Sequence, residues 1–320
     1  MTRVLILGVP RSGTTWSGRA LGATEGTAYV NEPDGFVDPY AFRIMLAHGE
    51  HPAIAPGTPA PDYERLWRGA FEGGRPASTA RDRAARFLYA RTPVETRRAA
   101  RASHDVPPRL RAVRRLATPL VAAPGARHVV VKTVLACLSA EWLAQHAADA
   151  RVVYVERHAY NVLSSWRDLG FVRDGREYGR VAAWAEDRWG VARPDDAGPH
   201  LARQAFFYGV LTAALRETAA AHPEWVRTTH EHLCVDSGAR FAELATSLGL
   251  EWGPRAAAFV TESDLTDTAE AATATDRPFR TRRATAEQPD RWRERLSVEE
   301  RSIIDTTLAT FPFDLVPDET

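Results

Sequence analysis

The sequence predicts an α/β fold in which a parallel sheet is flanked by helices, and two observations lead to this prediction. Short apolar runs with the length of buried strands alternate along the chain with longer segments of helical periodicity. The first apolar run also leads directly into a glycine-containing loop and then into a helical segment. Strands that are separated by helices pair in parallel through right-handed crossovers.

The expected elements follow one another in order along the chain. Strands are expected at residues 3–8, 27–31, 128–132, 151–156 and 225–230. Helices are expected at residues 14–22, 138–148, 159–168, 177–192, 200–221, 236–249 and 297–310. Residues 50–125 break the alternation, because they open with proline-rich turns and continue as an Arg/Ala-rich helical stretch. We therefore expect a single domain over residues 1–320, with residues 50–125 as a helical insertion that caps the site.

The composition limits the classes of function. The chain has 320 residues, 44% of them hydrophobic, which suits an ordinary globular core. Basic and acidic residues number 41 each, and this balance gives no support to nucleic-acid or membrane-surface binding. No apolar stretch approaches the roughly 18 residues of a membrane span, and no signal peptide is visible. Two cysteines without metal or redox spacing favour free thiols and a cytoplasmic location.

The loop after the first strand has the pattern of a phosphate-binding loop without its lysine. Residues Gly8–Thr15 read Gly-Val-Pro-Arg-Ser-Gly-Thr-Thr, and Thr14 stands where the nucleotide-hydrolase pattern requires Lys. A loop that joins a strand to a helix N-terminus favours an anion, which the backbone of Ser12, Gly13, Thr14 and Thr15 would hold. The missing Lys argues against nucleoside triphosphate hydrolysis, whereas Arg11 supplies a cation inside the loop. The alternative is a chance turn between a strand and a helix.

A second pattern lies at the end of the strand expected at residues 151–156. Arg157 lies just past the carboxyl end of this strand, and Ser165 follows eight residues later on an expected helix. Ligands in open α/β sheets bind outside the carboxyl ends of strands. An Arg fork together with a hydroxyl suits a terminal phosphate. The alternative is an Arg that ends a strand and an unrelated helical Ser.

Lys132 is the only lysine in a chain whose other 40 basic residues are arginine. It ends the strand expected at residues 128–132, where an arginine would serve equally well as a surface residue. A compact ammonium on a flexible stem differs from a planar guanidinium at a crowded transfer site. The sequence therefore indicates a catalytic role for Lys132, with accidental retention as the alternative.

These segments together resemble sulfotransferases that use 3′-phosphoadenosine 5′-phosphosulfate (PAPS). Pro10–Trp16 is similar to the 5′-phosphosulfate loop of that family, and the Arg157/Ser165 pair is similar to its 3′-phosphate motif. Lys132-Thr133 resembles the start of its Lys-Thr-His segment, whose Lys contacts the sulfuryl group. The resemblance implies a P-loop, nucleotide-kinase-like fold, PAPS as donor, no metal, and a hydroxyl of a small-molecule, sugar or lipid acceptor.

The chain departs from that family at the general base. Val134 stands where the cytosolic small-molecule enzymes of the family have histidine. Other branches use a glutamate after the second strand, and the resemblance assigns that role to Glu32. Pro33 favours an extended conformation at Glu32, which would put Asp34, the fallback base, on the same side. The alternatives for Glu32 are a helix N-terminal acid or an ion-pair partner of Arg11.

Weaker resemblances extend further along the chain. Trp16 matches a family Trp that stacks on adenine, with core packing as the alternative. Residues 229–233 resemble a strand-end segment that precedes a helix. Residues 280–283, followed by Trp292, resemble a C-terminal segment whose arginines close over the 3′-phosphate, which here would be Arg282 and Arg283.

Two other functions remain open from the sequence. A P-loop small-molecule kinase is disfavoured by Thr14 and Arg157, which stand where a Lys and a magnesium-binding acid would be expected. A nucleotide-binding module without turnover is disfavoured by Glu32 and Lys132, because binding alone needs no base. The acceptor and the oligomeric state cannot be read from the sequence.

Overall fold

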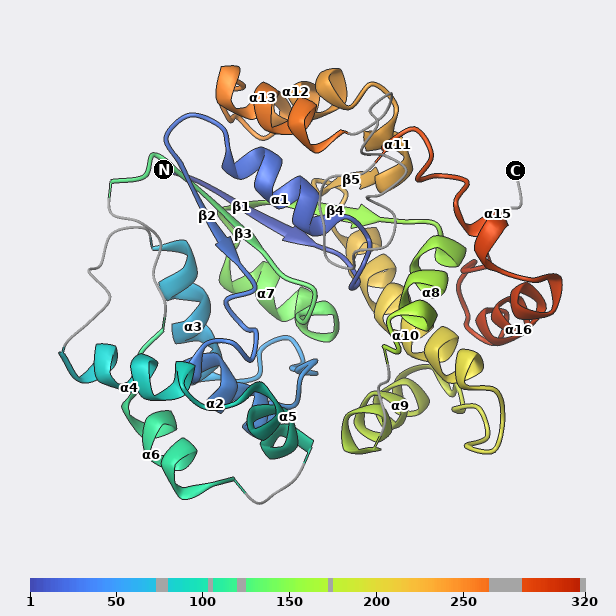
Figure 1. Ribbon diagram of the computed structural model, residues 1–320, viewed down its shortest axis with the longest axis horizontal. Helices are drawn as coiled ribbons and strands as arrows, with labels where there is room; N and C mark the ends of the chain where they lie inside the picture. Colours follow the sequence, from blue (N-terminus) through green and yellow to red (C-terminus); the bar gives the residue numbers. More distant parts are fainter. Residues whose placement is uncertain (73–79, 103–105, 120–124, 172–174, 265–283, 317–320) are drawn as a thin grey trace.

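A five-stranded parallel sheet forms the centre of the protein (Figure 1). The computed structural model describes residues 1–72, 80–102, 106–119, 125–171, 175–264 and 284–316. The strand order is β2-β3-β1-β4-β5. The strands are β1 (Thr2–Leu7), β2 (Thr27–Asn31), β3 (His128–Lys132), β4 (Ala150–Glu156) and β5 (Val226–Thr229). All five expected strands are present with ends within one residue of those expected, which confirms the predicted fold class.

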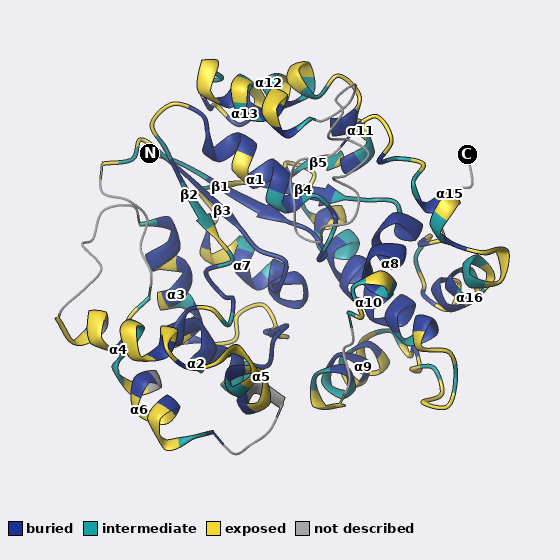
Figure 2. Ribbon diagram, viewed as in Figure 1, coloured by how far each residue is buried: buried dark blue, intermediate teal, exposed yellow. Residues whose placement is uncertain are grey.

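Both faces of the sheet are covered, as the alternation of side chains along a strand requires. Leu5 and Leu7 of β1 belong to one hydrophobic core, whereas Val4 and Ile6 belong to a second core on the opposite face. The central strands β1, β3 and β4 and the helix faces that pack on them are mostly buried in Figure 2, whereas the edge strands β2 and β5 are more exposed. The helices of the first core include α7 (Ala140–His146), α8 (Ala159–Asp168), α9 (Gly175–Trp189), α10 (His200–Ala221) and α16 (Val298–Leu308). Those of the second core include α1 (Thr14–Gly22), α12 (Ser237–Ser247) and α13 (Pro254–Ser263).

The sequence missed several helices, although their start signals are present. Helix α2 (Pro39–His48) has a proline in its first turn, and the Asp38 side chain accepts hydrogen bonds from the backbone N–H groups of Tyr40 and Ala41. The α13 helix likewise begins at a proline. The short helices α11 (His230–Cys234) and α15 (Trp292–Arg295) were also not expected.

Five helices separate β2 from β3 among the residues that the structure describes. After α2 come α3 (Pro61–Phe71), α4 (Ala80–Ala90), α5 (Val94–Ala102) and α6 (Pro108–Leu116). We refer to α4, α5 and α6 as the helical lobe; it lies at the periphery of the molecule in Figure 1. The lobe shares a small core of its own with α2, made of Phe42, Ala85, Tyr89, Ala100, Val106, Leu110 and Val113. Within the described ranges, no helix is long and apolar enough to cross a membrane.

Candidate active site at the carboxyl edge of the sheet

The loop between β1 and α1 has the geometry of an anion cradle. Gly13 precedes the helix with φ 93°, and a Cβ at this position would lie 2.5 Å from Nδ1 of His230, so only glycine fits. Thr14 and Thr15 open the first turn of α1, and their backbone N–H groups have no hydrogen-bond partner in the described chain. The buried Oγ of Ser12 also lacks a described partner. The cradle therefore leaves several polar groups to be satisfied by a ligand.

Backbone strain is concentrated at two of the predicted catalytic residues. Among the described residues, three non-glycine positions have positive φ: Arg11 at 75°, Glu32 at 47° and Asp236 at 52°. Such conformations cost free energy and persist where the surroundings enforce them, often at functional sites. Glu32 is held by a 2.7 Å hydrogen bond from its N–H to the carbonyl of Lys132, and its own carbonyl accepts one of 2.9 Å from Gly35. The extended conformation expected from Pro33 is therefore wrong, because a turn closes at Glu32.

Glu32 and Lys132 form an ion pair across the ends of β2 and β3. The Lys132 side chain is only 1% exposed, whereas that of Glu32 is 34% exposed. A buried ammonium is costly to desolvate and needs a charged partner of this kind. The alternative pairing of Glu32 with Arg11 is not the one found. The arrangement keeps the ammonium inside the protein and leaves part of the carboxylate accessible to a ligand.

Asp34 does not share the environment of Glu32. Its side chain is 5% exposed and accepts a hydrogen bond from the Thr133 hydroxyl, with 2.9 and 2.7 Å to its two oxygens. The Thr133 hydroxyl in turn accepts the N–H of Leu135 at 3.0 Å. Burial raises the pKa of Asp34 to about 7, partly offset by the Thr133 hydrogen bond. The turn at Glu32 thus directs Asp34 into the protein, contrary to the expectation that both carboxylates lie on one side.

Arg11, Arg157 and Ser165 are brought together from three elements. Nε of Arg11 donates to Oγ of Ser165 at 3.0 Å, which joins the loop to helix α8. An Nη of Arg157 donates to the carbonyl of Arg11 at 3.2 Å. The Nε of Arg157 makes no hydrogen bond to a described residue and lies 3.9 Å from Glu231. The expected pair of Arg157 and Ser165 therefore lies beside the loop, with Arg11 between them.

The electrostatics of this group are those of crowded, partly buried cations. The pKa of Arg157 is lowered to about 10, mainly by burial, with smaller contributions from the charges of Arg11 and Arg295. The pKa of Arg11 is also lowered, first by burial and then by Arg295. Three guanidinium groups thus share one region in which Glu231 is the acid that most offsets the burial of Arg157. Such a group is suited to a multiply charged anion.

Two contributors to the site were not identified as such in the sequence. Arg295 reaches the site from α15 and donates to the carbonyl of Ser164 at 3.2 Å. Glu231 follows β5 and accepts the backbone N–H of His158 at 3.2 Å, which holds the start of α8. The segment around Glu231 was noticed in the sequence but given no role. Both residues are distant in the chain from the recognised patterns, and no spacing links them to Arg157.

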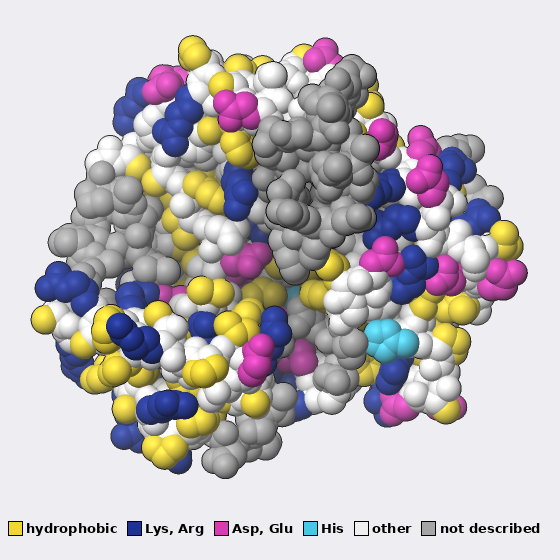
Figure 3. Space-filling model, in the orientation of Figure 1, with side chains coloured by type: hydrophobic (Ala, Val, Ile, Leu, Met, Phe, Trp, Pro, Cys, Tyr) yellow, Lys and Arg dark blue, Asp and Glu magenta, His cyan; other side chains and the backbone are white. Residues whose placement is uncertain are grey.

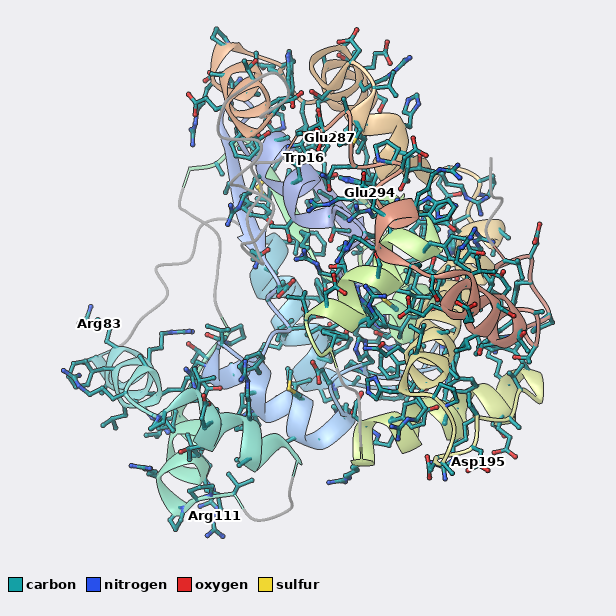
Figure 4. The ribbon with its side chains drawn as sticks, turned by 45° about the vertical axis from the view of Figure 1, so that its right-hand side comes forward. Trp16, Arg83, Arg111, Asp195, Glu287 and Glu294 are labelled. Atoms are coloured by element: carbon teal, nitrogen blue, oxygen red, sulfur yellow. The ribbon has the colours of Figure 1, made fainter. Side chains whose placement is uncertain are left out.

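Trp16 lies inside the protein in this structure. Its side chain is 5% exposed, its indole N–H donates to Oγ of Ser263 at 2.7 Å, and its ring meets those of His230 and Phe241 edge-on. These contacts correspond to the core-packing alternative, and adenine stacking on Trp16 stays a prediction (Figure 4). Arg282 and Arg283, expected to close over a 3′-phosphate, lie outside the described residues.

Comparison with known proteins identifies the protein family to which the chain belongs. A family model described as the sulfotransferase family matches residues 3–254. Because the match spans well over half of the chain, the chain belongs to the sulfotransferase family. No curated protein sequence matches it.

Solved structures, two of them of sulfotransferase domains, align over most of the chain. The sulfotransferase domain from the Synechococcus PCC 7002 olefin synthase has a TM-score of 0.48 at 15% identity, covering 98% of this chain and 96% of that chain. The sulfotransferase domain from the curacin biosynthetic pathway has a TM-score of 0.44 at 10% identity, covering 97% and 98%. Retinol dehydratase in a complex with retinol and PAP has a TM-score of 0.41 at 13% identity, covering 97% and 82%.

Proposed function

We propose that the protein transfers a sulfuryl group from PAPS to a hydroxyl of a small-molecule, sugar or lipid acceptor. The observation that carries this proposal is the ion pair between Lys132 and Glu32, whose ammonium is buried and whose carboxylate is partly accessible. It lies at the same edge of the sheet as the anion cradle, because β1, β2 and β3 run parallel. A module that only binds a nucleotide needs no such pair.

The residues of the cradle suit the two charged ends of the donor. The unpartnered N–H groups of Thr14 and Thr15 and the Ser12 hydroxyl would hold the 5′-phosphosulfate. Arg157 and Ser165 would hold the 3′-phosphate, which fits the unsatisfied Nε of Arg157. When bound, PAPS supplies an activated sulfuryl group on a phosphate leaving group.

The chain itself would move one proton and stabilise negative charge. The Glu32 carboxylate would accept the proton of the acceptor hydroxyl as the oxygen attacks. The Lys132 ammonium and the Arg11 guanidinium would stabilise the negative charge that develops at the reacting centre. Positioning and charge supply most of the catalysis in transfers of this kind, as they do for phosphoryl groups.

Two measurements test this proposal. Thermal shifts should be larger with PAPS and with 3′,5′-adenosine bisphosphate than with ATP, GTP or 5′-AMP. Purified protein with labelled PAPS should then label a hydroxyl acceptor from a panel of sugars, lipids and secondary metabolites. A shift with ATP and phosphate transfer from it would instead establish the kinase. Binding of PAPS without transfer to any acceptor, and without its hydrolysis, would favour the non-catalytic module.

A further inference from the structure

The zero net charge of the chain conceals an uneven distribution. Residues 80–116, which contain the helical lobe, have eleven arginines and three acidic residues. The remainder of the chain therefore has eight more acidic than basic residues. The expectation that charge balance disfavours membrane-surface binding holds for the whole chain but not for this segment.

Most arginines of the helical lobe are exposed. Two of the described arginines are exceptions. Arg86 forms an ion pair with Asp38, and the buried Arg97 lies over the ring of Tyr89. Arg83 and Arg111 point away from the body of the protein in Figure 4, and basic side chains are spread over the lobe in Figure 3. The exposed arginines are Arg81 and Arg83 of α4, Arg91 directly after its end, Arg98 of α5, and Arg109, Arg111 and Arg115 of α6.

Bulky apolar side chains stand among these arginines. Phe87 is 57% and Leu88 55% exposed, whereas Ala85 and Tyr89 of the same helix are buried. Arg83 and Phe87 are four residues apart and so share one face of α4, and Arg91 follows directly after the end of the helix. The Arg91 guanidinium lies 3.5 Å from the centre of the Phe87 ring. We call these exposed arginines, with Phe87 and Leu88, the cationic face.

We propose that the cationic face docks on the surface of an anionic lipid bilayer. Clustered arginines attract the anionic headgroups of such a surface, and each basic residue near it strengthens binding. Phe87 and Leu88 would enter the boundary between headgroups and acyl chains, as apolar residues of interfacial helices do. A nucleic acid or another polyanion would use the arginines but would have no use for an exposed Phe-Leu pair. The peripheral position of the lobe in Figure 1 makes it accessible to a flat surface.

Helix α4, which carries part of the cationic face, contacts the chain segment that follows Glu32 of the candidate active site. Arg86 of α4 pairs with Asp38, and the Tyr89 hydroxyl donates to the carbonyl of Phe36. Both partners lie in the segment that leads from Glu32 to α2. Helix α4 therefore links the cationic face to the chain segment that follows Glu32, a suitable arrangement for an acceptor that is itself an amphiphile. The docking proposal itself does not depend on the proposed function.

Vesicle co-sedimentation tests the proposal. The full-length protein should bind vesicles of phosphatidylcholine with phosphatidylserine, should not bind phosphatidylcholine alone, and should dissociate as NaCl is raised. The double variant Arg83→Glu/Arg91→Glu should bind more than about tenfold more weakly, because two attractive charges become repulsive. The variant Phe87→Ser/Leu88→Ser should also lose about tenfold or more, because its apolar side chains no longer enter the bilayer.

Matched controls separate docking from loss of fold and from catalysis. Arg255→Glu and Val298→Ser change exposed residues of the same types on α13 and α16 and should bind vesicles like the unchanged protein. All variants should keep their melting temperature and their affinity for 3′,5′-adenosine bisphosphate. Failure of the unchanged protein to bind anionic vesicles at low salt overturns the proposal, whatever its turnover. So does binding of polyglutamate or DNA in place of vesicles, since the partner would then be an acidic macromolecule.

Discussion

The candidate active site and the helical lobe use the same residue type in opposite ways. In the site, Arg157 is 10% exposed, its pKa is lowered by burial, and its contacts fix it beside the phosphate-binding loop. In the lobe, Arg83 and Arg111 extend into solvent from helices whose other faces form a small core. Desolvated charges gain interaction strength and a fixed geometry, whereas exposed charges act collectively and are screened by salt. The difference indicates chemistry in the first region and attraction of a surface in the second.

The largest expected effect is that of Glu32→Gln on turnover. Glutamine keeps the shape of the side chain but cannot accept a proton, and loss of a general base lowers rates by about 10²–10⁴-fold. The affinity for 3′,5′-adenosine bisphosphate should stay nearly the same, because Glu32 is not among the residues expected to hold the nucleotide. Steady-state kinetics with labelled PAPS and calorimetric binding of the product nucleotide would measure both.

Glu243→Gln is the matched control, since Glu243 is an exposed acid of α12 with its own ion pair to Arg240. Normal turnover of Glu32→Gln together with loss of turnover in Asp34→Asn would show that the fallback carboxylate is the base. Full activity of both variants would mean that the acceptor needs no protein base. The burial of Asp34 leads us to expect neither result.

Lys132→Arg should have the next largest effect. At 1% exposure the site of the ammonium has little room for a planar guanidinium, so the pair with Glu32 should be displaced. We expect turnover to fall by about tenfold or more, as it does when a donor to a developing charge is lost. The reciprocal change Arg83→Lys in the lobe should leave turnover and melting temperature unchanged. If Lys132→Arg left turnover as unchanged as Arg83→Lys does, the two regions would not differ in this respect, and Lys132 would have no catalytic role.

A smaller effect is expected on nucleotide selectivity. The unchanged protein should prefer 3′,5′-adenosine bisphosphate over 5′-AMP by tenfold or more, because charge-assisted hydrogen bonds contribute about 1.5–3 kcal/mol each. Arg157→Lys and Ser165→Ala should each reduce this ratio, since one loses a fork of donors and the other a hydroxyl. Arg98→Lys in the lobe is the control. An undiminished ratio in both site variants would show that other residues hold the 3′-phosphate.

Most of the sheet and several site residues follow from local patterns in the sequence. Each strand is a short apolar run, and Lys132 and Arg157 lie at or just past strand ends, so a parallel sheet necessarily brings them to one edge. The glycine in the loop also predicts a positive φ at that position, and Gly13 has a φ of 93°. Local sequence rules are sufficient wherever neighbours in the chain determine the geometry.

Other features depend on contacts between distant segments. Arg295 reaches Ser164 across 131 residues, and no spacing rule relates the two. Glu32 is tied to the end of β3 by a hydrogen bond from its N–H to the carbonyl of Lys132, while the N–H of Gly35 donates to the Glu32 carbonyl and closes a turn. These two bonds override the influence of Pro33. The charge of the lobe was visible in the sequence, but its significance depends on which arginines are exposed. Tertiary structure decides that exposure.

The smallest expected effect concerns the pH dependence of stability and Asp34. Its folded-state pKa of about 7 lies above the usual value of about 4 for an aspartate in an unfolded chain. Between these values the folded protein retains a proton that the unfolded chain releases, so this group makes stability fall as pH rises through that window. Asp34→Asn cannot titrate but can still accept the Thr133 hydrogen bond. Urea unfolding at pH 5 and pH 8 should therefore show the unchanged protein losing about 2 kcal/mol more than the variant. Parallel pH profiles for the two proteins would mean that Asp34 ionises normally and that its carboxylate is better solvated than its burial against Thr133 indicates.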